Sequence, residues 1–203
     1  MTHIFCYKIS DLPPDEVLLR QTPPSLLTGY EKYTHKDTRH ASLGVRWLLS
    51  KALQSLDMKT EIALCFYESG QPYLSPSLCY ISLAHSAEML AVAISDAPCG
   101  IDTENTSAVR DAAKLAKRYL GTNECEKVLS SSTPSLVYLE YFCQMEALVK
   151  QKGDLLLTQA APLLQNISPE EKQLYTIPTD AGTEVIFAIG QPPFFIQNTS
   201  FFE

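Results

Sequence analysis

Apolar and polar positions alternate along the chain with two different periods, and these predict two kinds of element. Strand-length apolar runs bounded by Gly, Pro and Ser turns occur at residues 4–7, 62–67, 79–83, 90–95, 100–104, 174–177 and 184–189. Apolar positions recurring every three to five residues predict helices at 37–56, 108–120, 123–129 and 136–152. The order strand, helix, strands, helices, strands is typical of an α+β protein.

The predicted elements divide near residue 100. A chain of 203 residues is long enough for one large domain or two small fused ones. We expect two α+β halves: residues 1–100, with the helix at 37–56 and most of the early strands, and residues 101–203, with the remaining helices and the last strands. No repeat in the sequence proves that the halves are related.

Composition and cysteine spacing exclude several classes of protein. Apolar residues make up 45% and charged residues 19% of the chain, which is ordinary globular usage and excludes collagen-like and disordered chains. No apolar run approaches the ~18 residues of a membrane span, and Asp11, Asp15 and Glu16 interrupt the first segment before a signal peptide could form. The six cysteines contain no C-x-x-C pair, so we expect reduced thiols. These features predict a cytoplasmic protein with no membrane partner.

The net charge of −7 disfavours a nucleic-acid partner, because a polyanion is repelled unless positive charge is locally concentrated. Positive charge is concentrated between Lys32 and Lys51, where Asp37 is the only acidic residue. The basic and imidazole side chains of this segment are Lys32, His35, Lys36, Arg39, His40, Arg46 and Lys51. The segment predicts a binding site for a small polyphosphate.

Two carboxylates follow a glycine in the segment GIDTE, residues 100–104. Strand alternation places Asp102 and Glu104 on one face and the intervening residues on the other. Two like charges on one face persist if they are solvated, or if a hard cation such as Mg²⁺ lies between them. This pattern alone leaves both interpretations open.

A third carboxylate lies on the last predicted helix. Phe142, Glu146 and Lys150 are four residues apart and share a helix face. An i,i+4 Glu–Lys pair is often only a surface pair. Here the apolar neighbours Met145 and Val149 predict that the pair is half-buried, where a carboxylate needs a partner.

Three segments in this order and at this separation resemble the 4'-phosphopantetheinyl transferases, particularly the Sfp-like and AcpT-like monomeric class. They are SLAHS at 82–86, GIDTE at 100–104 and FCQMEALVK at 142–150. Alone, His85 would more often be a hydrogen-bonded structural residue. Arg39, Leu43 and Arg46 resemble the basic helix of that family, and the turn ESGQPY at 68–73 resembles its Gly-Lys-Pro turn. The resemblance runs from about Arg39 to Gly153.

The resemblance implies two α+β halves in a pseudo-twofold arrangement, with an active site between them. Coenzyme A is then expected to bind through Mg²⁺, or Mn²⁺, held by Asp102, Glu104 and Glu146. The 3'-phosphate is expected near Arg39 and His85, Lys150 beside the phosphates, and Arg46 and Gln71 among the coenzyme A contacts.

The same resemblance implies a reaction with a partner protein. A serine of an acyl or peptidyl carrier protein attacks the β-phosphorus of coenzyme A, and 3',5'-ADP leaves. Glu146 is expected to accept the serine proton, and Lys150 is the second expected catalytic residue.

Four positions depart from the family pattern. Phe142 stands where the family has Trp, Ala84 where it has Ser, and Met145 and Gln71 where it has Lys. Residue 145 lies about 100° around the helix from Glu146, so we expect its side chain at the rim of the cleft. No proposed metal ligand is lost, so we expect the metal site to survive and coenzyme A affinity or rate to suffer.

Two other classes of function remain open. A module that only binds coenzyme A or a carrier protein would explain the lost cations, but it has little need of three mutually repelling carboxylates. A magnesium-dependent phosphohydrolase would use similar ligands and release its product to water.

Overall fold

The computed structural model describes residues 1–58 and 61–198, which form an α+β protein. The strands are β1 (Thr2–Lys8), β2 (Ala63–Phe66), β3 (Pro72–Ser75), β4 (Tyr80–His85), β5 (Met89–Ser95), β6 (Gly100–Asn105), β7 (Lys172–Thr179), β8 (Gly182–Ile189) and β9 (Phe194–Asn198). The α-helices are α1 (Asp15–Gln21), α2 (Lys36–Ser55), α3 (Ala112–Tyr119), α4 (Thr122–Ser130), α5 (Pro134–Lys152) and α6 (Leu157–Ala160).

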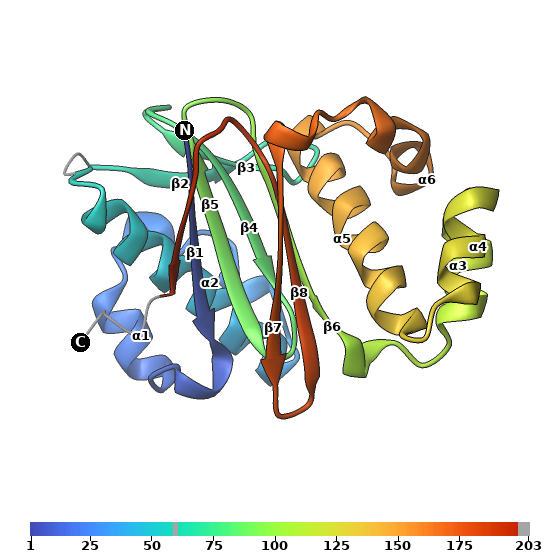
Figure 1. Cartoon of the computed structure of the whole chain (residues 1–203). Coiled ribbons are helices and arrows are strands. Elements are labelled where there is room, and N and C mark those ends of the chain that lie inside the picture. The colour runs from blue at the N-terminus through green and yellow to red at the C-terminus, as the bar shows by residue number, and fades with distance from the viewer. Residues whose placement is uncertain (59–60, 199–203) are drawn as a thin grey trace.

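Two sheets pack face to face between helices (Figure 1). The first sheet has the strand order β4-β5-β1-β9, the second has the order β6-β8-β7, and β2 and β3 form a separate hairpin. Side chains of α2 share one apolar core with β1 and β5, and side chains of α5 share another with β8. A third core, between the sheets, joins Ile4 and Ala91 to Ile101 and Ile186. The layer order is therefore α2, first sheet, second sheet, α5.

Strand alternation explains how one sheet can contribute to two cores. In β1, Phe5 belongs to the core with α2, whereas Ile4 and Cys6 belong to the core between the sheets. Every residue of β5 is buried, because helix α2 covers one face of its sheet and the second sheet covers the other. A continuous apolar run is what a strand covered on both faces requires.

The ends of α5 follow from its sequence. Pro134 occupies the first turn, where its missing N–H is no loss. Gly153 ends the helix in the left-handed region at φ 79°, a conformation that glycine adopts without steric cost. Because α5 packs on the second sheet on one side and on α3, α4 and α6 on the others, only its first and last residues, Pro134 and Lys152, are exposed.

Met145 does not lie where the sequence predicted it. Its side chain has 0% exposure and lies in the apolar core that α5 shares with the neighbouring helices. The expectation of a position at the cleft rim was wrong, because it assumed one buried helix face whereas α5 is covered on several sides.

The predicted helices at 37–56, 123–129 and 136–152 are confirmed as α2, α4 and α5. The helix predicted from residue 108 begins only after Asp111, whose side chain accepts a hydrogen bond from the backbone N–H of Lys114. Four short helices and strands were not predicted: α1, β3, α6 and β9. Of these, β9 pairs in parallel with β1, so the last described strand joins the first sheet.

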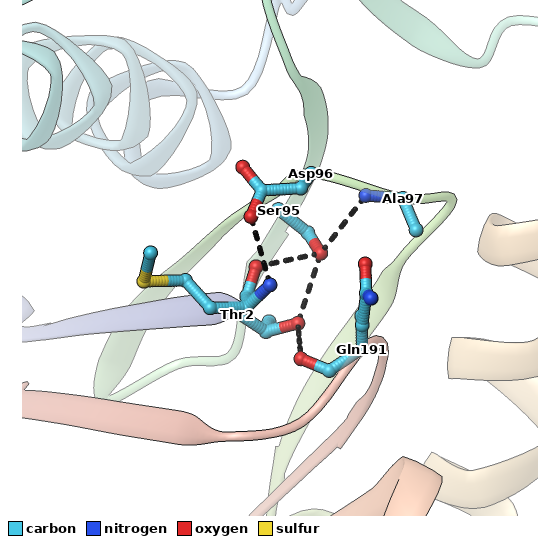
Figure 2. A network of polar contacts seen from close by, with 6 residues as sticks. Thr2, Ser95, Asp96, Ala97 and Gln191 are labelled. Atoms are coloured by element: carbon cyan, nitrogen blue, oxygen red, sulfur yellow. Dashed lines mark hydrogen bonds and ion pairs between the residues drawn. The ribbon is translucent and has the colours of Figure 1, made fainter.

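Polar contacts hold the chain where it crosses between the two sheets (Figure 2). The Thr2 hydroxyl donates to the Gln191 carbonyl at 2.8 Å and lies 2.9 Å from the Ser95 hydroxyl oxygen. The Met1 amino group contacts Asp96 at 2.9 Å. These contacts join the start of β1 to the connection that leads into β6 and to the one that leads out of β8.

Candidate active site between β6 and α5

Helix α5 lies unusually close to β6, and Gly100 allows this. A Cβ atom at Gly100 would lie 1.8 Å from the Ala147 carbonyl oxygen. In the ladder with β8, Asp102 is opposite Phe187 and Glu104 is opposite Val185, and both β8 residues face the core shared with α5. The prediction that the two carboxylates share one strand face is therefore confirmed, and this face is the one turned toward α5.

Asp102 is the most buried of the proposed ligands, with 6% exposure. One of its oxygens, Oδ1, accepts a hydrogen bond from the Lys150 ammonium at 2.7 Å. Its other oxygen, Oδ2, is buried and has no hydrogen-bond partner within residues 1–58 and 61–198. Since a buried carboxylate oxygen normally has a partner, this half-satisfied group is a candidate ligand contact.

The carboxylates share one desolvated region of negative charge. Burial, followed by the charge of Asp102, raises the pKa of Glu104 to about 7. Burial and Asp102 also raise the pKa of Glu146, which Lys150 opposes. Burial and the nearby carboxylates Asp102 and Glu104 raise the pKa of the Cys143 thiol as well. Three carboxylates and one ammonium thus face one another across the β6–α5 contact.

The three carboxylates fit a divalent metal ion by their chemistry but are not arranged as a closed metal site. No three His, Cys, Asp or Glu side chains in the described part of the chain are arranged to hold such an ion, and the Lys150 ammonium is the cation on Asp102. The donor chemistry nevertheless fits, because a hard cation prefers carboxylate oxygens and Asp102 Oδ2 is without a partner among these residues. The residues that would hold the ion are Asp102, Glu104 and Glu146.

A cavity of about 290 Å³ opens beside Lys150, between the halves. Its volume is close to the lower end of ligand pockets, ~300 Å³. We call it the inter-half cavity. It is lined by Lys32, Tyr33, Ser42, Val45, Arg46, Phe66, residues 69–72, residues 82–85, Val149, Lys150 and Gly153.

Residues 98–189 match the family model of the 4'-phosphopantetheinyl transferase superfamily. The match covers less than half of the chain, and over this segment the chain is similar to that superfamily. The matched segment contains β6 and α5, and therefore all three carboxylates and Lys150. No curated protein matches the chain, and no helix in the described residues is long and apolar enough to cross a membrane.

The first half of the chain supplies the other side of the cavity. His85, at the end of β4, lines the inter-half cavity and also a larger cavity of about 940 Å³ next to the start of α2. Burial, together with the charge of Lys150, lowers the pKa of His85. The imidazole is therefore biased toward its neutral form.

Arg46 lines the cavity but is largely occupied by the protein. It is 4% exposed, and four hydrogen bonds join its guanidinium to the Thr28 carbonyl and to the carbonyl and hydroxyl of Ser42. Arg39 lies about two turns earlier on α2, is partly exposed and is not among the residues that line the inter-half cavity. Gln71 lines the cavity, and its side chain donates to the Lys150 carbonyl at 2.8 Å.

Sequence reasoning missed two contributors to the site. Tyr138 is 3% exposed and stacks on Phe142 with ring centroids 5.7 Å apart, and burial and nearby Glu104 and Glu146 help to raise its pKa. It shields the carboxylates on the α5 side. Its spacing of four from Phe142 and eight from Glu146 was the available signal. Phe66, on the short strand β2, had no comparable signal.

Proposed function

We propose that this protein transfers the 4'-phosphopantetheine group of coenzyme A to a serine of an apo acyl or peptidyl carrier protein, with a divalent cation, Mg²⁺ or Mn²⁺, as cofactor. The observation that carries the proposal is the half-satisfied Asp102, paired with Lys150 and facing Glu104 and Glu146. It lies beside a cavity and within the segment that matches the superfamily.

The proposed reaction exchanges one bond to phosphorus for another. The carrier serine oxygen forms a bond to the β-phosphorus of coenzyme A, and the bond from that phosphorus to the bridging oxygen breaks. The serine proton passes to Glu146, and 3',5'-ADP leaves with the electron pair. Such a transfer depends on positioning and charge neutralisation more than on covalent help from the protein.

The residues of the chain divide this work between the halves. Lys150 is proposed to contact the phosphates, and the raised pKa of Glu146 suits a group that must hold a proton. The bound cation supplies charge neutralisation of the pyrophosphate. His85 and Arg39 are proposed to face the 3'-phosphate, and Arg46 to shape the cavity wall while its hydrogen bonds hold the loop at Thr28.

Mass spectrometry of an apo carrier protein tests the proposal. The carrier is incubated with the enzyme, coenzyme A and Mg²⁺, and a gain of one phosphopantetheine group on its serine is expected. Release of phosphate or phosphopantetheine to water, with no change in the carrier, would indicate a phosphohydrolase instead. Coenzyme A binding without any reaction would support a binding module.

A further inference from the structure

The hairpin of β2 and β3 reaches across to the end of α5 through one side chain, Gln71. The Gln71 Nε2 donates to the Lys150 carbonyl oxygen at 2.8 Å. This carbonyl is among the last four of α5, and these carbonyls have no N–H donor within the helix itself. Gln71 therefore satisfies an otherwise unpaired group at the helix end.

Gln71 is held in place by contacts within the hairpin and by the close approach of the end of α5. Its own carbonyl accepts from the Tyr67 N–H at 3.0 Å, which closes the hairpin turn, and Tyr67 stacks on Tyr73 at 4.4 Å. On the α5 side, a Cβ atom on Gly153 would lie 2.2 Å from Gln71 Oε1. Gly153 thus ends the helix and also makes room for the Gln71 amide.

Lys150 is consequently held at both ends. Its carbonyl is bound by Gln71, from the first half of the chain, and its ammonium is bound by Asp102, from β6. All three of Gln71, Lys150 and Gly153 line the inter-half cavity. A neutral amide can make this contact without adding a positive charge next to the Lys150 ammonium.

We infer that Gln71 is a positioning residue, which acts on bound coenzyme A through Lys150 by clamping the end of α5 to the β2–β3 hairpin. The inference rests on the proposed function for the identity of the ligand. The clamp itself is a property of the protein without ligand. The clamp also gives the neutral side chain at position 71 a structural role, in place of the positive charge that a Lys would carry.

Hydrogen exchange without ligand tests the clamp. Gln71→Met keeps the length of the side chain and removes the donor, so amides in residues 67–71 and at the end of α5 should exchange faster together. Gln151→Met is the matched control, because Gln151 also donates its amide from α5 to a carbonyl of the first half, that of Pro98, at 3.1 Å. It should leave residues 67–71 unchanged. Unchanged exchange in Gln71→Met would overturn the clamp.

A double-mutant cycle on coenzyme A affinity then separates positioning from direct contact. Loss of the hydrogen bond in Gln71→Met should weaken binding about fivefold by calorimetry. In the Lys150→Met background the Gln71→Met substitution should have no further effect. Additive effects would show that Gln71 touches the ligand itself and would overturn the inference.

Two outcomes keep this test distinct from that of the proposed function. If the wild type binds coenzyme A but modifies no carrier protein, the proposed function fails and the cycle still decides the role of Gln71. If Gln71→Met does not fold, Gln71→Glu tests the same contact, since a carboxylate cannot donate to the Lys150 carbonyl; normal exchange in that variant would contradict the clamp.

Discussion

The two faces of the β6–β8 ladder both carry buried carboxylates, but they satisfy them differently. On the face toward the first sheet, Glu184 has 0% exposure and accepts hydrogen bonds from the Thr103 hydroxyl and from the Asn105 amide at 3.1 Å. On the face toward α5, Asp102 has one oxygen paired with Lys150 and one with no partner among the described residues. The difference separates a carboxylate that the fold satisfies from one that it satisfies only in part and that is our proposed ligand contact.

The largest effect is expected on activity when the unsatisfied face is changed. Asp102→Ala should abolish transfer to a carrier protein while the variant stays folded, because relief of repulsion among the carboxylates offsets the lost contact with Lys150. The measurements are the carrier mass after incubation and the circular dichroism of the variant. Wild-type activity in Asp102→Ala would refute the assignment of this face.

A buried charge with no partner should cost the most stability. Met145→Lys places an ammonium in the apolar core around α5, so the free energy of unfolding should fall by about 3–5 kcal/mol. Urea unfolding measures this, with the exposed position Leu129→Lys as the control. A stable variant with improved coenzyme A affinity would show that residue 145 reaches the cleft after all.

A smaller loss of stability is expected on the satisfied face. Glu184→Gln places amide hydrogens against the Thr103 and Asn105 donors, so we expect a loss of about 1–2 kcal/mol. Transfer activity per folded molecule should persist. A loss of activity at full stability would mean that both faces serve the reaction, and the contrast between them would fail.

A further effect concerns pH. The pKa of Glu104 is raised from 4.5 to about 7, so the folded state keeps a proton that the unfolded state has lost, and the free energy of unfolding should decline as pH rises from about 4.5 to about 7. Glu104→Gln should lessen this decline, and Glu146 should account for part of the remainder. Unfolding curves at several pH values measure this pH dependence. If it is the same in Glu104→Gln as in the wild type, the Glu104 carboxylate is solvated.

Much of this contrast was accessible from the sequence, because it depends on local periodicity. The alternation in residues 100–104 predicted which side chains share a face, and the spacing of Glu146 and Lys150 predicted their common helix face; the structure brings these side chains together. The helix at 37–56 was equally well specified by its apolar period.

The remaining features depend on contacts between distant segments, which no local pattern encodes. The expected position of Met145 was wrong because several elements cover α5. Strand β9 was missed because its partner β1 is nearly two hundred residues away in the sequence. Two of the four hydrogen bonds that Arg46 donates go to the Thr28 carbonyl in a distant loop, and only the fold shows that the guanidinium is engaged there.

Intact mass spectrometry on three proteins side by side tests the central claim most directly. Wild type, Asp102→Ala and Glu184→Gln are each incubated with coenzyme A, Mg²⁺ and the same apo carrier protein, and with excess chelator as a control. Our account predicts one added phosphopantetheine group with wild type and with Glu184→Gln, and none with Asp102→Ala or with chelator. Equal modification by Asp102→Ala, or none by the wild type with any apo carrier protein, would contradict it.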